Sequence, residues 1–346
     1  MWYLEAVKKI DKAIEQQAID RQNDLTKPKG SLGLLEGLAT RLAGRQGVIK
    51  PNVDKIQISV FAGDSGIADE QVSLFPQVVT MQMVQNFVSK GAAITVLAEQ
   101  YQADFEVIDV GVANPLIETI GVVNQRVADG TKNFAITQAM NKDELQSALN
   151  AGQECVMRAE NKGVTLFIGG EMGIANTTCA TAILCELLGK TASELTGAGT
   201  GLDDAGIERK VAVIGKALDK YQVGNNPLKA LQTYGGFEIV ALAGAYIACA
   251  QRGISILVDG FISTTAALAA VRINPQVKEW MEFSHQSAEK GHWLVLKELG
   301  VKPILDMGMR LGEGSGASVA IGIMKSACCL HNNMATFSEA MVLEGK

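Results

Sequence analysis

The alternation of short apolar segments with longer helical patterns constrains the fold of this chain more than any other feature. Five segments have the length and apolar character of buried strands: 55–62 (KIQISVFA), 105–110 (FEVIDV), 164–168, 254–258 and 303–309. Helical periodicity fills most of the intervals between them, over residues 2–20, 31–46, 80–99, 143–161, 176–188, 207–218, 236–250, 264–271 and 317–331. Buried strands that alternate with helices predict a parallel sheet covered on both faces, which is a doubly wound α/β architecture.

Length and charge narrow the class of protein further. A chain of 346 residues with 47% hydrophobic residues can form a large α/β domain together with a smaller unit. The net charge of −6, without a basic run, argues against a nucleic-acid partner. The apolar stretch 237–249 is shorter than the roughly 20 residues that cross a bilayer, and the first residues form an amphipathic pattern rather than a signal peptide. We therefore expect a cytoplasmic protein that does not enter a membrane.

The cysteines and histidines show no metal-binding pattern. The six cysteines contain no CxxC pair: Cys155, Cys179, Cys185, Cys249, Cys328 and Cys329. The three histidines, His285, His292 and His331, lack the spacing of metal ligands. We interpret the cysteines as small buried hydrophobic residues in a reducing compartment. The acids Asp64, Asp69 and Glu70 are expected to be solvated, so no metal is assigned.

Glycines and acids follow each predicted strand. The segments are GDSG after the first strand, DVG after the second, GGEMGIANTT after the third, DGFIS after the fourth and GMRLGEGSGA around the end of the last. Ligands bind beyond the carboxyl ends of the strands in parallel sheets. These residues therefore predict one convergent site. Turn formation would explain the glycines, but not the acids among them.

Two glycine-containing segments are candidates for phosphate binding. In 169–178 (GGEMGIANTT), Asn176, Thr177 and Thr178 offer helix-start donors, although simple helix capping remains an alternative. The segment 197–201 (GAGTG) departs from GxGxxG, and no GxxxxGK[ST] pattern occurs, so the case for a dinucleotide is weak. A glycine loop for a mononucleotide phosphate, with Lys210 as the counter-charge, stays open.

Glu313 is the strongest candidate for a general base. It lies between glycines in 312–316 (GEGSG), and small neighbours leave its carboxylate accessible. A desolvated carboxylate has a raised pKa, which suits a base that works near neutral pH. A solvated turn glutamate is the alternative. The segment 284–291 (SHQSAEKG) contains a serine and a histidine but no GxSxG elbow, so it is interpreted as a polar loop.

Taken together and in order, these segments resemble the nicotinate-nucleotide–dimethylbenzimidazole phosphoribosyltransferase family. The similar segments are 25–38 (LTKPKGSLGLLEGL), 61–70 (FAGDSGIADE), 170–178 (GEMGIANTT), 199–210 (GTGLDDAGIERK), 235–238 (GGFE), 258–263 (VDGFIS), 284–291 and 311–317 (LGEGSGA). The resemblance implies a Rossmann-like domain with a mainly parallel six-stranded sheet and helices on both faces, over residues 51–317. It also implies a small helical domain from residues 1–50 and 318–346, with parts of 270–300 as a further candidate, and a dimer.

The resemblance also implies the reaction and the roles of particular residues. The family transfers the phosphoribosyl group of nicotinate mononucleotide to an aromatic base, 5,6-dimethylbenzimidazole, giving α-ribazole phosphate for the nucleotide loop of cobamides. It implies Glu313 as the general base and Glu171 as a supporting acid, with neither metal nor redox cofactor. The implied base pocket consists of Phe75, Met83 and Met172, for which a plain core position is the alternative. The candidate nucleotide and phosphate contacts are Gly173, Asn176, Thr177, Gly199, Lys210 and Ser287.

Two departures from the family pattern leave the acceptor open. Ser65 stands in Asp64-Ser65-Gly66 where the family usually has a histidine, and Ala175 replaces a glycine of GEMGIGNTT. The alternatives are transfer to phenol, p-cresol or adenine, with the chain as part of a homodimer or of a heterodimer with a homologous chain. A non-catalytic partner subunit is a hypothesis of another class. A dinucleotide-dependent oxidoreductase would rest on fold analogy alone.

Overall fold

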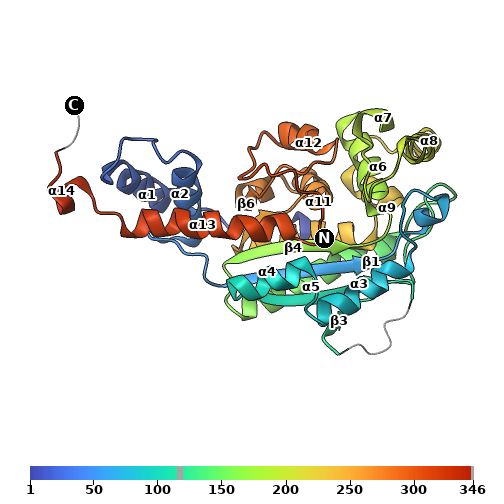
Figure 1. The fold of residues 1–346 in the computed structure, drawn as a ribbon, viewed down its shortest axis with the longest axis horizontal. Helices are drawn as coiled ribbons and strands as arrows, with labels where there is room; N and C mark the ends of the chain where they lie inside the picture. The colour runs from blue at the N-terminus through green and yellow to red at the C-terminus, as the bar shows by residue number, and fades with distance from the viewer. Residues whose placement is uncertain (115–119, 344–346) are drawn as a thin grey trace.

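A six-stranded parallel sheet forms the centre of the molecule in the computed structural model, which describes residues 1–114 and 120–343 (Figure 1). The strands are β1 (Ile56–Gly63), β2 (Asp104–Gly111), β3 (Val122–Asn124), β4 (Leu166–Met172), β5 (Ser255–Val258) and β6 (Met281–Phe283). Their order is β3-β2-β1-β4-β5-β6, and every neighbouring pair is parallel. The predicted α/β fold is confirmed. The strand order reverses between β1 and β4, where such sheets bind ligands.

Each central strand divides its side chains between two hydrophobic cores, because successive residues of a strand point to opposite faces. In β1, Phe61 joins one core while Val60 joins the other, and all eight residues of this strand are buried. The same alternation places Phe167 and Ile168 of β4 on opposite faces. The apolar runs seen in the sequence therefore reflect burial on both faces of the sheet.

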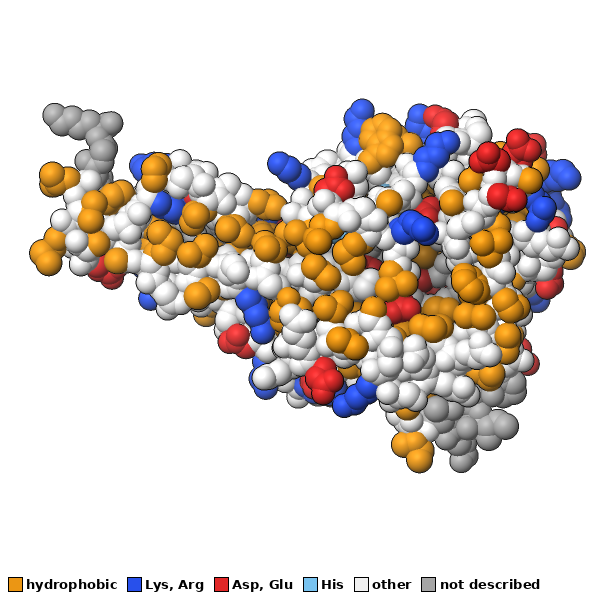
Figure 2. Space-filling model, in the orientation of Figure 1, with side chains coloured by type: hydrophobic (Ala, Val, Ile, Leu, Met, Phe, Trp, Pro, Cys, Tyr) orange, Lys and Arg blue, Asp and Glu red, His pale blue; other side chains and the backbone are white. Residues whose placement is uncertain are grey.

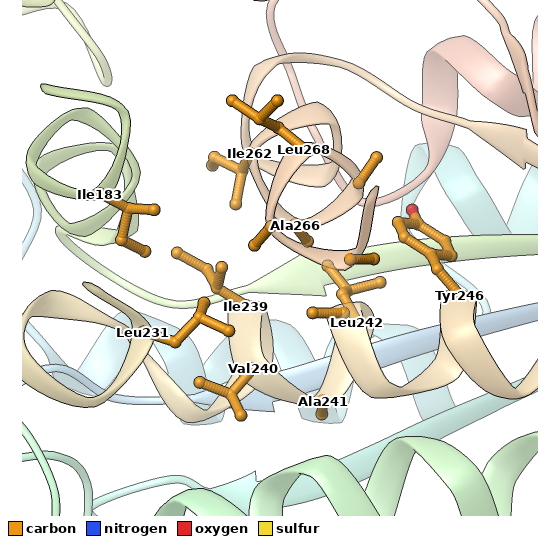
Figure 3. Close-up of a cluster of buried hydrophobic side chains, with 14 of the residues drawn as sticks. Ile183, Leu231, Ile239, Val240, Ala241, Leu242, Tyr246, Ile262, Ala266 and Leu268 are labelled. Carbon is orange, nitrogen blue, oxygen red and sulfur yellow. The ribbon is translucent and has the colours of Figure 1, made fainter. Parts of the chain in front are cut away.

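Helices cover both faces, as the alternation predicts. The core that contains Val60 is covered by α2 (Leu34–Gln46), α3 (Val78–Val88), α4 (Ala93–Tyr101) and α13 (Ser315–Asn333). The other core contains residues of α5 (Lys142–Asn161), α6 (Asn176–Leu188), α7 (Ala192–Leu195), α8 (Asp204–Tyr221), α9 (Pro227–Tyr234), α10 (Phe237–Arg252), α11 (Phe261–Ile273) and α12 (His292–Leu299). Figure 3 shows Ile183, Leu231, Leu242 and Leu268 from four of these helices pointing toward a shared interior. No helix within residues 1–114 and 120–343 is long and apolar enough to cross a bilayer.

The helices α1 (Lys12–Asp24) and α2 meet the C-terminal helices at one extremity of the molecule, whereas the N-terminus itself lies near the middle of the view in Figure 1, with Trp2 Nε1 donating to Asn150 Oδ1 at 2.9 Å. At that extremity α1 and α2 lie beside the end of α13 and α14 (Phe337–Ala340) (Figure 1). The Arg21 Nε donates to the His331 carbonyl at 3.0 Å, and Leu25 forms an antiparallel bridge with Thr336. These contacts support the small helical unit, but its boundaries stay a prediction. α13 passes through residue 318 without a break.

Several predicted elements near the N-terminus are wrong in detail. The helix predicted over 2–20 is a short 3₁₀ turn, η1 (Trp2–Leu4), followed by extended chain and then α1. The Asp11 side chain caps α1 by accepting from Ile14 N–H at 3.0 Å. Ser31 does not cap the next helix, because α2 begins only at Leu34 after Gly33, whose φ of 56° is left-handed. The helix predicted over 80–99 is two helices, which separate where Lys90 turns left-handed at φ 59°.

The last predicted strand is also wrong. Over 303–309 the structure has only an isolated parallel bridge between Leu305 and His285. The Ile304 N–H donates to the Phe283 carbonyl and the Leu305 N–H to the Ser284 carbonyl, both at 2.9 Å, so the segment pairs beside β6. Pro303 lacks a backbone donor and Gly308 is left-handed at φ 68°, so this pairing does not become a regular strand. The strands that sequence analysis missed, β3 and β6, have three residues each, which is too short for a periodic pattern. Cys329 is exposed, whereas the other five cysteines are buried as predicted.

Candidate active site

The loops after β4, β5 and β6 open onto one cavity of about 430 Å³ at the carboxyl edge of the sheet. All the predicted site residues except Lys210 line it: Glu171, Glu313, Phe75, Met83, Met172, Gly173, Asn176, Thr177, Gly199 and Ser287. Lys210 lies directly behind the wall, where its Nζ donates to Thr177 Oγ1 at 2.6 Å. The structure thus brings together residues from five separate segments of the chain. Their individual roles stay predictions.

Glu313 lies in a run of three left-handed residues. Gly312, Glu313 and Gly314 have φ values of 89°, 63° and 85°. The Glu313 side chain is only 6% exposed, and its Oε2 has no hydrogen-bond partner in the part of the chain that the structure describes. Burial, assisted by the negative charge of Asp259, raises the pKa of Glu313 to about 7. A carboxylate with this pKa suits general base catalysis near neutral pH.

Glycines allow this loop to approach the sheet closely. A Cβ atom on Gly170 in β4 would collide with the Glu313 carbonyl oxygen, and one on Gly312 would lie 2.5 Å from Glu171 Oε1. The glycines of GGEM and LGEG therefore have a packing reason beyond turn formation. They let two carboxyl groups from distant parts of the chain share one cavity.

Glu171 differs from Glu313 in its environment. It is the penultimate residue of β4, is almost fully buried, and accepts a hydrogen bond from Asn176 Nδ2. Burial, followed by repulsion from Glu238, Asp259 and Glu313, raises the pKa of Glu171 well above its usual range. Neighbouring carboxyl groups resist double ionisation. The site therefore disfavours the charged form of Glu171, and its role as a supporting acid stays a prediction.

The start of α6 offers an anion cradle. Its N-cap, Ala175, has a left-handed φ of 73° and supplies no capping side chain. The N–H groups of Asn176 and Thr178 donate to the carbonyls of Gly173 and Ala175 at 3.2 and 2.9 Å, which leaves the Thr177 N–H and hydroxyl for a ligand. Gly199 lies against the same place, since a Cβ there would be 2.9 Å from Thr177 Oγ1 and 3.3 Å from Lys210 Nζ. Burial lowers the pKa of Lys210 to about 8, while the nearby Glu289 opposes that shift. This arrangement can bind a phosphate.

Part of the cavity lining is apolar and includes residues that sequence analysis missed. Phe75, Met83 and Met172 face the cavity together with Val79 and Phe261. Phe75 is 51% exposed, so it is not a plain core residue. An aromatic ring and flexible thioethers suit a flat apolar ligand. Val79 and Met83 are spaced i, i+4, which places them on one face of a helix, and this spacing could have identified Val79 from the sequence.

Asp259, His285 and Arg310 are polar cavity residues that sequence analysis also missed as site residues. The signal for Asp259 was its place directly after β5, in DGFIS. The loop 284–291 contains no serine–histidine nucleophile pair. Instead, the Ser287 backbone N–H donates to His292 Nδ1 at 2.7 Å, and burial lowers the pKa of His292 to about 3. His292 is therefore a neutral ring that holds the Ser287 loop in place.

Ser65 does not line the cavity. Its side chain is buried behind the β1 end, where Oγ lies 3.3 Å from Thr131 Oγ1 and 3.1 Å from Cys179 Sγ. The serine in place of the family's histidine therefore gives no direct structural reason for a different acceptor. Within residues 1–114 and 120–343, no group of three or more His, Cys, Asp or Glu side chains is arranged to hold a metal ion.

Comparison with known proteins gives full-length matches. A family model described as phosphoribosyltransferase matches residues 7–342. The nicotinate-nucleotide–dimethylbenzimidazole phosphoribosyltransferase of Pseudomonas putida (strain W619) is 54% identical over 344 residues, covering 99% of this chain and 98% of the relative. The Pseudomonas aeruginosa relative of the same name is 50% identical over 342 residues, with 99% and 97% covered. The crystal structure of the enzyme of that name from Thermus thermophilus superposes with a TM-score of 0.92 at 39% identity, covering 97% of this chain and 100% of the other.

Proposed function

The chain belongs to the nicotinate-nucleotide–dimethylbenzimidazole phosphoribosyltransferase family, and from that premise we propose that it transfers the phosphoribosyl group of nicotinate mononucleotide to 5,6-dimethylbenzimidazole. The products are nicotinate and α-ribazole phosphate, a precursor of the cobamide nucleotide loop. The observation that carries this proposal is the Glu313 carboxyl, buried at a cavity whose lining contains both the anion cradle and a set of apolar side chains.

The reaction exchanges one glycosidic bond for another at ribose C1′. The bond from C1′ to the nicotinate nitrogen breaks, and its electron pair returns to that nitrogen, which leaves as a neutral pyridine ring nitrogen. An azole nitrogen attacks C1′ from the opposite face, so the β-linked donor gives an α-linked product. The azole N–H proton moves to the Glu313 carboxylate. General base catalysis of this kind contributes about 10²–10⁴-fold to the rate.

Each part of the cavity lining has a defined task in this mechanism. The first turn of α6 binds the phosphate of the donor through Thr177, whose hydroxyl accepts a hydrogen bond from Lys210 behind the cavity wall. Phe75, Met83 and Met172 hold the flat ring of the acceptor. Glu171, whose pKa is raised well above its usual range by burial and by neighbouring carboxyl groups, is the supporting acid beside Glu313. Fixed positions for donor and acceptor supply the remaining acceleration, because alignment removes much of the entropic cost of a bimolecular step.

The test is substitution of the proposed base. Purified Glu313→Gln protein is incubated with nicotinate mononucleotide and 5,6-dimethylbenzimidazole, and nicotinate release is followed by chromatography. We expect kcat to fall by about 10²–10⁴-fold while the KM values change little, because Gln keeps the shape and loses the proton acceptor. Glu208→Gln, on an exposed position of α8, is the matched control. Wild-type turnover in Glu313→Gln would contradict the mechanism, and a wild-type protein without transfer would contradict the function.

The acceptor and the assembly belong to the same proposal. Parallel assays with phenol, p-cresol and adenine decide whether dimethylbenzimidazole is the preferred acceptor, and turnover by the isolated chain decides against a non-catalytic subunit. We propose a homodimer in the cytoplasm. Figure 2 shows hydrophobic side chains gathered along α13 and continuing across the same face, which supports an interface there. Light scattering with the purified chain measures the assembly, and a monomeric mass would contradict the homodimer.

A further inference from the structure

Asp259 holds the backbone on the C-terminal side of Glu313. It follows β5 directly and is 2% exposed. Its Oδ2 accepts from Gly314 N–H at 3.1 Å, and its Oδ1 accepts from Ala317 N–H at 2.8 Å. The first donor is the residue directly after Glu313, and the second lies in the first turn of α13. One carboxylate thus connects the Glu313 loop to the helix that follows it.

The backbone of this loop needs such a restraint. Glu313 is a non-glycine residue at φ 63°, between two left-handed glycines. A left-handed conformation is unfavourable for residues with a Cβ atom, and it persists where surrounding contacts enforce it. The close approach of Gly170 restrains the carbonyl side of Glu313, and Asp259 restrains the N–H groups that follow. Without Asp259, nothing comparable would hold those N–H groups in the described structure.

His285 completes the surroundings of Asp259. Its Nε2 lies 3.6 Å from Asp259 Oδ1, and its ring rests against Gly316, where a Cβ atom would collide with it. The carboxylate therefore has two backbone donors and an imidazole as its polar neighbours. Its short side chain, placed directly after a strand, has little freedom to move away from them.

We propose that Asp259 is a positioning residue for the transfer reaction: it fixes Glu313 through the N–H groups of Gly314 and Ala317 and presents its negative charge to the Glu313 carboxyl. This inference rests on the proposed role of Glu313 as the base. The charged and titratable groups that face the same cavity are Glu171, Asp259, His285, Glu289 and Arg310. After burial, the charge of Asp259 is the cause that raises the pKa of Glu313, which makes that carboxylate a stronger base.

The experiment compares two substitutions at residue 259. Asp259→Asn keeps the shape, removes the charge, and turns an NH₂ group toward one of the backbone donors. We expect kcat to fall by about 10- to 100-fold, since small misplacement of a catalytic group has effects of this size. We also expect the acid limb of the pH profile of kcat/KM to move down by about one pH unit, because a neighbouring like charge is gone. Asp259→Glu keeps the negative charge, but its longer side chain moves the carboxylate away from its position beside the Gly314 and Ala317 N–H groups. We therefore expect a lower kcat and an unchanged acid limb.

Glu289→Gln removes a different charge from the same cavity and is expected to leave the acid limb where it is. Wild-type kcat and an unmoved limb in Asp259→Asn would overturn the inference. A lower kcat in Asp259→Asn with an unchanged acid limb would also overturn the inference, because it would indicate general damage to the fold. If Asp259→Asn does not fold, Asp259→Glu decides, and wild-type kcat in that variant would overturn the inference. Full activity of Glu313→Gln would instead overturn the proposed base.

Discussion

Glu238 has an unusual position for an ionisable side chain. It lies in the first turn of α10, is completely buried, and neither carboxyl oxygen has a hydrogen-bond partner from another side chain in the described part of the chain. Gly63, Gly173 and Gly236 surround it, and a Cβ on Gly63 would lie 3.2 Å from Glu238 Oε2. Burial, with the charge of Asp64 as a smaller cause, raises the pKa of Glu238 to about 8.

This pKa predicts how the folded state responds to pH. The unfolded chain releases the Glu238 proton near its ordinary pKa of 4.5, whereas the folded chain keeps it up to about pH 8. The contribution of this proton to stability is therefore full below pH 4.5 and is lost progressively as the pH rises to about 8. The slope in that window is about −1.4 kcal/mol in the free energy of unfolding per pH unit. By about pH 7 the loss relative to acid pH amounts to about 3 kcal/mol.

The assay is urea unfolding of the wild type and of Glu238→Gln at several pH values between about 5.5 and 7.5, inside the window where the two states differ in protonation. The unpaired amide of Gln has a desolvation cost of its own, about 1–3 kcal/mol, but that cost does not change with pH. We therefore expect the slope of the free energy of unfolding against pH to become less negative in Glu238→Gln by about 1.4 kcal/mol per pH unit. Glu208→Gln, which removes an exposed carboxylate, is the control for overall charge.

The test depends on the slope of the free energy of unfolding against pH, and the absolute stability of the variant does not affect it. Equal slopes in wild type and Glu238→Gln would show that Glu238 ionises alike in the folded and unfolded states. The burial argument for this residue would then be refuted. The same argument underlies the raised pKa of Glu171, so the direction of that shift would need revision as well.

Further predictions concern the site and its supports. The kcat/KM of the wild type should rise with pH through about 7, because Glu313 must lose its proton to act as a base, and initial rates of nicotinate release measure this. Lys210→Met should raise the KM for nicotinate mononucleotide by about 10- to 100-fold, the value of a charge-assisted hydrogen bond, while the KM for the base stays unchanged. Ala175→Gly should increase the free energy of unfolding by about 0.5–1 kcal/mol, because it relieves a left-handed alanine, and thermal unfolding measures this. Ser65→Ala should leave the preference among acceptor bases unchanged in competition assays, because Ser65 does not reach the cavity.

Local patterns were sufficient for the longer elements. β1 and β4 contain apolar runs that are buried on both faces of the sheet, and such runs can be recognised from the sequence alone. The same holds for the longer covering helices α5, α6, α10 and α13, whereas the helix predicted over 80–99 is two helices and the eight-residue helix α9 was not predicted. The shortest strands, β3 and β6, escaped because three residues show no period, and their place at the sheet edges depends on pairing with distant neighbours. The apolar run at 303–309 failed as a strand because a proline and a left-handed glycine outweigh its hydrophobicity.

The site divides in the same way. The amino-acid order indicated that acids and glycines lie at the ends of the strands, and parallel strands bring their carboxyl ends to one edge, so the place of Glu171 at this edge could be inferred. Glu313 was placed there through a strand over 303–309 that the structure does not contain, and the resemblance of LGEGSGA to the family was what singled it out. Only the tertiary structure decided that Glu313 is left-handed and buried, that Asp259 accepts from Gly314 and Ala317, and that Ser65 is turned away from the cavity. These hydrogen bonds join residues more than fifty positions apart. Periodicity and propensity describe neighbours along the chain, whereas desolvation and hydrogen-bond geometry depend on what the folded chain brings together.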